Sequence, residues 1–150
     1  YAVRVGGGHN HLFGLHNCIL VKDNHIKAAG GVTRAVEILR SRAQHTFKIE
    51  LECESMTMVK EALDCGVDII MLDNMTMDEM REAVAFINGR AMVEASGGVR
   101  EHTVVEIAKT GVDVISAGDL TNNIQVIDVS LDVGDMKASA IRQMTTGRAH

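Results

Sequence analysis

Short apolar runs alternate with longer segments of helical periodicity along most of this chain. The runs predict strands that end at Lys22, Glu52, Asp73, Ser96 and Gly118. Between them, apolar positions at helical spacing predict helices over about 33–42, 55–64, 76–87 and 101–110. Another apolar run, at 126–131, is a candidate for one more strand.

The predicted helices carry ordinary start and stop signals. Ser55 is a predicted N-cap, and Thr76 or Asp78 fills the same role for the next helix. Glycine ends the first of these helices at Gly66, and Asn88-Gly89 ends the second. These signals separate one strand, one helix and two short loops in each unit of the chain.

This βα repeat predicts an α/β fold with parallel strands. An open doubly wound sheet and a closed (β/α) barrel both satisfy the repeat. Strands of an open parallel sheet are usually apolar on both faces, whereas these strands carry ionisable residues on one face near their carboxyl ends: Lys22, Glu50, Glu52, Asp73 and Glu94. A barrel mouth accounts for such a face better. We therefore predict a (β/α) barrel of about six parallel strands, present in part over 1–134, followed by a C-terminal tail over 135–150.

Composition narrows the class of partner. The 150 residues suit one domain, with 46% hydrophobic and 23% charged residues. The net charge of −5, the lack of a basic run and the scarcity of aromatic residues argue against nucleic acid as a partner. No apolar stretch is long enough for a membrane helix. Three cysteines without metal-ligand spacing are typical of a reducing compartment, so we expect a cytoplasmic protein without a membrane partner.

Two strand-end carboxylates are the leading candidates for chemistry. Glu52 and Asp73 end neighbouring predicted strands, and such a pair can hold a divalent cation or a developing positive charge. Strand-end acids are also often merely solvated. Lys22 ends the preceding strand, where it could form an ion pair with Asp23 or recognise an anionic substrate.

Glycine-containing loops follow the last two predicted strands of the repeat. Their sequences are Ala95-Ser96-Gly97-Gly98 and Ser116-Ala117-Gly118. Glycine lets backbone N–H groups approach an anion, and a following helix start adds partial positive charge. Because barrels often bind phosphate between the loops of their last strands, this pair predicts a phosphate site.

A histidine pair near the start suggests a competing chemistry. His9 and His11 form an HxH pair of the kind that binds zinc in metal-dependent hydrolases. That interpretation requires the pair to end a strand, with further histidines at later strand ends. Glycines precede the pair, and His45 and His102 fall in or near predicted helices, so a hydrolase is disfavoured.

Six stretches together resemble the quinolinate phosphoribosyltransferase family, also called carboxylating nicotinate-nucleotide pyrophosphorylases. They are YAVRVGGGHNH (1–11), LVKDNHI (20–26), KIELECE (48–54), VDIIMLDN (67–74), EASGGV (94–99) and TGVDVISAGDLT (110–121). The resemblance implies a barrel of about six strands, of which the first strand and a separate N-terminal domain would be missing here. It also implies transfer of a phosphoribosyl group from phosphoribosyl pyrophosphate to quinolinate with decarboxylation, a Mg2+ cofactor, and a homodimer in the full-length form.

The family pattern assigns roles to residues at matching positions. It implies that Lys22 and His11 lie near the quinolinate carboxylates, and that Glu52 and Asp73 face the ribose and the magnesium-bound pyrophosphate. Lys22, Glu52 and Asp73 are thus the expected catalytic residues. The expected 5′-phosphate contacts are Ser96, Gly97, Gly98, Ala117 and Gly118.

Four positions depart from the family pattern. Leu12 stands where the family has an arginine that grips a substrate carboxylate, and Asn17 replaces an aspartate. Asp119 and Asn122 replace an alanine and a basic residue near the last loop, and a carboxylate at Asp119 is expected to repel phosphate. A catalytically inactive fragment or a divergent phosphate-binding barrel therefore remains the alternative to an active transferase.

Overall fold

The structure is a computed structural model, and it describes residues 1–14, 16–131, 133 and 141. Five strands lie within these residues: β1 (Ile19–Val21), β2 (Ile49–Cys53), β3 (Ile69–Asp73), β4 (Met92–Ser96) and β5 (Val114–Ile115). The helices of the same residues are α1 (Ala2–Val5), α2 (Asp23–Ala29), α3 (Val32–Arg42), α4 (Met56–Asp64), α5 (Met77–Ile87), α6 (Val104–Ala108) and α7 (Asp119–Asn122).

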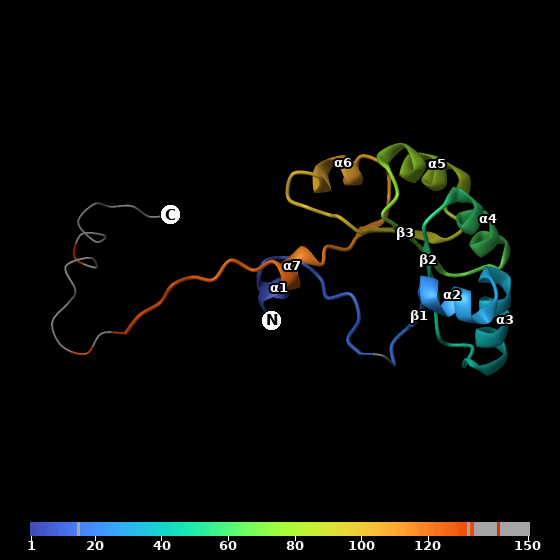
Figure 1. The fold of residues 1–150 in the computed structure, drawn as a ribbon, viewed down its shortest axis with the longest axis horizontal. Coiled ribbons are helices and arrows are strands. Elements are labelled where there is room, and N and C mark those ends of the chain that lie inside the picture. Colours follow the sequence, from blue (N-terminus) through green and yellow to red (C-terminus); the bar gives the residue numbers. More distant parts are fainter. Residues whose placement is uncertain (15, 132, 134–140, 142–150) are drawn as a thin grey trace.

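The five strands form one parallel sheet in the order β1-β2-β3-β4-β5. Each strand pairs with the next one along the chain, so the order never reverses as it does in a doubly wound sheet. Helices α3 to α6 follow one another along the outer side of the arc of strands (Figure 1). Sequential strands with helices outside are the arrangement of a (β/α) barrel, which confirms the predicted fold class. Strands β1 and β5 are the two edges of the described sheet.

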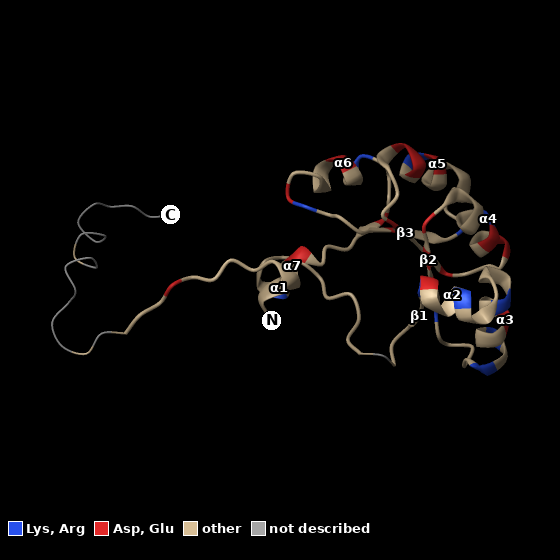
Figure 2. Ribbon diagram, viewed as in Figure 1, with Lys and Arg blue, Asp and Glu red and all other residues tan. Residues whose placement is uncertain are grey.

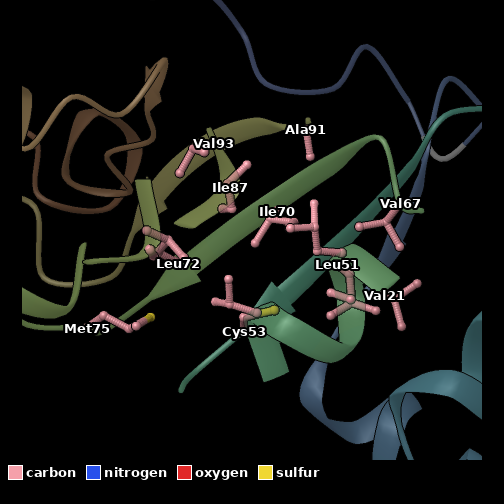
Figure 3. Close-up of a cluster of buried hydrophobic side chains, with 14 of the residues drawn as sticks. Val21, Leu51, Cys53, Val67, Ile70, Leu72, Met75, Ile87, Ala91 and Val93 are labelled. Atoms are coloured by element: carbon pink, nitrogen blue, oxygen red, sulfur yellow. The ribbon is translucent and has the colours of Figure 1, made fainter. Parts of the chain in front are cut away.

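The helix-facing side of the sheet makes the core. Leu51 and Cys53 of β2 and Ile70 and Leu72 of β3 are fully buried there (Figure 3). Removing such a side chain from water stabilises the fold by about 1.5 to 3 kcal/mol. The predicted alternation is therefore confirmed, because the ionisable residues of the same strands lie on the opposite, inner side. Charged residues also mark the outer helices α2 to α5 (Figure 2).

Helix starts follow the predicted capping chemistry. Ser55 Oγ accepts a hydrogen bond from the backbone N–H of Met58 at 3.4 Å. Thr76, rather than Asp78, caps α5, in a capping box with Glu79 that satisfies two backbone donors reciprocally. These caps place α4 and α5 immediately after the strands whose acids are discussed below.

The sequence Gly-Val-Asp occurs twice, at 66–68 and at 111–113, and its aspartate has a structural role in both places. Asp68 Oδ2 accepts a hydrogen bond from the backbone N–H of Ile49 at 2.9 Å. Asp113 Oδ2 accepts one from the N–H of Val93 at 2.8 Å. Each aspartate precedes one strand and ties it to the neighbouring strand.

Several predicted elements differ from the structure. Helix α2 follows directly after Lys22 and was not predicted; its C-cap is Gly30, with φ +90°. Helix α6 is shorter than the predicted 101–110. The predicted strand at 126–131 is wrong, because these residues form no described strand and the side chains of Val126 and Leu131 are about 90% exposed.

The predicted C-terminal tail at 135–150 lies outside the described residues except for residue 141. Within the described part of the chain, no helix combines the length and apolar character needed to cross a membrane.

Candidate functional site

The carboxyl ends of β1 to β4 bring four predicted residues to one edge of the sheet. We call Lys22, Glu52, Asp73 and Ser96 the strand-end site. All four line one hollow of about 210 Å³. Parallel pairing explains this, because it aligns the carboxyl ends of successive strands and sets Asp73 directly beside Ser96.

The strand-end site carries an unbalanced negative charge. Partial burial, and then the neighbouring charge of Asp73, raise the pKa of Glu52, while Lys22 acts in the opposite direction. The Oδ2 atom of Asp73 also accepts a hydrogen bond from the Asn74 side chain at 2.8 Å. Two carboxylates facing one lysine are suited to a divalent cation, which prefers such oxygen ligands.

The glycine loop after β4 needs its glycines. Gly97 and Gly98 have φ values of +83° and +62°, in the left-handed region that favours glycine. A Cβ on Gly97 would overlap the Asn74 side-chain amide and lie 2.8 Å from the Asn74 backbone nitrogen. Asn74 in turn donates its backbone N–H to the carbonyl of Ser96 at 3.1 Å. The loop therefore packs tightly against the end of β3, next to Asp73.

The loop after β5 differs from that after β4. Gly118 has φ −62°, an ordinary helical value, and a Cβ there would lie 3.3 Å from the Asn122 side chain. Ser116, just before Ala117, lines the same hollow as the strand-end site and donates its backbone N–H to Ala95 at 2.9 Å. The second predicted anion loop thus begins beside the first.

An ion pair joins the two loops. The Arg100 guanidinium, two residues after Gly98, pairs with the carboxylate of Asp119, which follows Gly118. Asp119 was expected to repel phosphate, and here Arg100 balances its charge. The same contact occupies a guanidinium that would otherwise be available to an anion.

A second group of ionisable residues lies deeper on the inner face. His11 Nε2 is 3.4 Å from Glu50 Oε1 and 3.2 Å from Glu94 Oε1, and we call these three residues the inner triad. Glu50 and Glu94 are only 2% and 3% exposed. Burial, and then the charge of Glu94, raise the pKa of Glu50. Ser116 Oγ donates a hydrogen bond to Glu94 Oε1 at 2.5 Å.

Strand alternation predicted only two members of the inner triad. Glu50 and Glu94 were predicted on the inner face by strand alternation, but their closeness to His11 was not predicted. His11 comes from a loop without periodicity, so no spacing in the sequence signals this contact. His11 also borders the hollow of the strand-end site, and its role as a substrate contact stays a prediction.

The departures near the start of the chain lie around a larger cavity. A cavity of about 830 Å³ is lined by His11, Leu12 and Asn17 together with Glu50 and Glu94. Leu12 presents an apolar side chain where a guanidinium would offer paired N–H donors. The cavity therefore holds two buried acids, and Lys48 is the one lysine or arginine among its described lining residues.

Fold and site together define the class of this protein. A parallel sheet in sequential order, with polar side chains gathered at the carboxyl ends of its strands, defines an α/β protein of the barrel type. Proteins of this class bind their ligands at that end of the sheet.

The chain belongs to the family described as "Quinolinate phosphoribosyl transferase, C-terminal domain", which matches residues 1–132. It is 43% identical over 140 residues to a probable carboxylating nicotinate-nucleotide pyrophosphorylase of Methanocaldococcus jannaschii, covering 89% of this chain and 49% of the relative. A Bacillus subtilis protein of the same name is 41% identical over 133 residues, covering 89% and 46%. This chain therefore spans about half the length of these relatives.

A solved structure supports the same relationship. The nicotinate-nucleotide pyrophosphorylase of Ehrlichia chaffeensis has a TM-score of 0.83 and 42% identity, covering 88% of this chain and 48% of that one. The family recognised from sequence motifs is thus confirmed.

Proposed function

We propose that this chain is the barrel part of an enzyme that transfers a phosphoribosyl group from phosphoribosyl pyrophosphate to quinolinate. The reaction releases pyrophosphate and carbon dioxide and gives nicotinate mononucleotide, a precursor of NAD. The observation that carries the proposal is the convergence of Lys22, Glu52, Asp73 and Ser96 on one hollow in a member of this family.

The strand-end carboxylates suit the glycosyl step. A bond forms between the pyridine nitrogen and the anomeric carbon of ribose while the bond to pyrophosphate breaks. Positive charge develops on the ribose ring as pyrophosphate leaves, and Glu52 and Asp73 would stabilise it. The same two residues would hold Mg2+, which would neutralise the departing pyrophosphate when bound. Their shared negative charge, opposed by Lys22 alone within the strand-end site, fits such a cation.

The remaining residues suit substrate positioning. Lys22 and His11 border the same hollow and would face the carboxylates of quinolinate. The loops with Ser96, Gly97 and Gly98 and with Ala117 and Gly118 would receive the 5′-phosphate. Decarboxylation then replaces a ring carboxylate by a proton and asks the protein mainly for orientation and nearby positive charge.

A phosphate-binding barrel without catalysis is the second candidate. Leu12 supports it, because this side chain lines the cavity without the guanidinium that would bind a substrate carboxylate. Under this alternative the chain binds the phosphorylated substrate but does not turn over quinolinate.

Calorimetric titration distinguishes the two candidates. The chain is titrated with phosphoribosyl pyrophosphate and magnesium, and the resulting complex is then titrated with quinolinate. The transferase proposal expects heat in both steps, whereas the alternative expects heat only in the first. No heat in either step would rule out both for this chain.

The substitution Leu12→Arg probes the carboxylate site directly. A restored guanidinium is expected to tighten quinolinate binding about tenfold, because a charge-assisted bidentate contact contributes about 1.5 kcal/mol or more. An exposed Phe13→Arg variant is the matched control for added charge. Unchanged binding by Leu12→Arg would show that the carboxylates lie elsewhere.

Assembly and location remain expectations. We propose a homodimer for the full-length form and a cytoplasmic location, and both rest on the sequence arguments above. Size measurement of the full-length protein in solution tests the first.

A further inference from the structure

The inner triad has the geometry of a metal site. One ligand atom from each of His11, Glu50 and Glu94 lies within 4.8 Å of the other two. The distances from His11 Nε2 to the two carboxylate oxygens are 3.4 and 3.2 Å. Two ligands that bind a tetrahedral Zn2+ at about 2.1 Å each are separated by roughly 3.4 Å, so the two separations match.

The triad also contains an unsatisfied buried atom. Glu50 Oε1 has no hydrogen-bond partner within the described part of the chain, although its residue is only 2% exposed. A single N–H at Nε2 of His11 cannot serve two carboxylates well. One cation held between the three side chains would satisfy all of them and compensate the two buried acids.

We propose that His11, Glu50 and Glu94 bind a divalent transition-metal ion, with Zn2+ as the ion of matching geometry. An imidazole and two carboxylates are ordinary ligands for this ion, and the fourth position would open toward the 830 Å³ cavity. The hydrogen bond from Ser116 to Glu94 orients one ligand from outside the triad, as is usual around protein metal sites.

This site differs from the other two metal interpretations of the chain. It uses only His11 of the HxH pair, because His9 is exposed and does not belong to the triad. It also shares no ligand with Glu52 and Asp73. His11 is, however, also a proposed quinolinate contact. Zinc binding is measured without substrates, so its test does not depend on the proposed function. If that function holds, the ion would also add positive charge beside Leu12, where a substrate carboxylate is expected.

The test is zinc binding by the whole chain after treatment with a chelator. Calorimetry gives stoichiometry and affinity, and the visible spectrum after substitution with Co2+ reports the coordination. Two matched pairs of variants are compared: His11→Ala with His9→Ala, and Glu50→Gln with Glu54→Gln, an exposed acid just after β2. Circular dichroism checks that each variant is folded.

We expect one ion per chain and a loss of affinity of about 100-fold in His11→Ala and Glu50→Gln. The variants His9→Ala and Glu54→Gln should bind as the parent does. The intense tetrahedral Co2+ bands should disappear only in His11→Ala and Glu50→Gln. Binding that is absent, or equal in His11→Ala and His9→Ala, overturns the proposal. If Glu50→Gln does not fold, His11→Ala decides the outcome alone, because its side chain is 35% exposed on a loop.

Discussion

Two groups of acids share strand β2 but occupy different environments. Glu52 belongs to the strand-end site, where it is partly exposed and close to Lys22. Glu50 lies two residues earlier on the same face, is 2% exposed, and faces another buried acid. Two residues along one strand therefore separate a carboxylate that solvent reaches, Glu52, from one that is buried and needs a partner within the protein, Glu50.

The largest change in ligand affinity is expected from a substitution in the strand-end site. Asp73→Asn removes a charge that would hold magnesium and the ribose, so affinity for phosphoribosyl pyrophosphate with magnesium should fall about 100-fold, or about 2.7 kcal/mol. Calorimetric titration measures this change. The control is Asp78→Asn on the exposed side of α5, which should bind normally. Equal affinity of the two variants would contradict the role of the strand-end site.

The next effect concerns the loop that supports the strand-end site. Gly97→Ala should lower the free energy of unfolding by about 2 kcal/mol, since a Cβ meets Asn74 at a positive φ. Gly98→Ala has a positive φ but open space around the Cβ, so its cost should be about 1 kcal/mol. Urea unfolding gives both values. Equal costs would show that the contact with Asn74 is not limiting.

A substitution in the inner triad is expected to raise the free energy of unfolding, by less than Gly97→Ala lowers it. In the presence of chelator at neutral pH, Glu50→Gln should raise the free energy of unfolding by about 1 kcal/mol, because it removes one of two buried carboxylates that face each other. Glu52→Gln should raise it less, since Glu52 is more exposed.

The same pair predicts a pH dependence. A folded pKa above the ordinary 4.5 means that Glu50 supports folding below that pH and loses this contribution as the pH rises through its folded pKa. The advantage of Glu50→Gln should therefore vanish near pH 4 and grow toward pH 7. Unfolding curves at both values check this, and a constant difference would show that folding does not raise the pKa of Glu50.

The smallest change in ligand affinity is expected from breaking the ion pair that joins the two glycine-containing loops. Asp119→Ala should tighten inorganic phosphate binding about threefold, because it frees Arg100, and exposed ion pairs contribute at most about 1 kcal/mol. The control is Asp128→Ala, an exposed acid outside the loops. Unchanged or weaker binding by Asp119→Ala would show that Arg100 does not reach the anion.

Much of the fold followed from local pattern. The strand ends at Asp73 and Ser96 were correct, and the one at Glu52 fell one residue before the observed end at Cys53, because apolar alternation and a terminal polar residue coincide in each run. Helix α2 was missed because Asp23–Ala29 offers a single large apolar residue, Ile26, which gives no clear period. The strand at 126–131 was wrong because an apolar run alone does not supply a pairing partner.

The part of the site that depends on strand pairing was also predictable from the sequence, and the part that depends on loops was not. Parallel pairing brings Lys22, Glu52 and Asp73 to one edge, so their convergence followed from the repeat. The approach of His11 to Glu50 depends on how a glycine-rich loop folds back over the sheet, and no local preference specifies that path. The pairing of Arg100 with Asp119 was missed for the same reason.

The aspartates of the Gly-Val-Asp repeat have a consequence for errors in folding. Slippage of β2 by a single residue would turn Glu50 and Glu52 toward the helices and Leu51 toward the mouth. The bonds from Ile49 to Asp68 and from Val93 to Asp113 fit only the correct alignment of the neighbouring strands. Asp68 and Asp113, at the opposite end of the sheet, thus stabilise the strand alignment that keeps Glu50, Glu52 and Glu94 on the inner face.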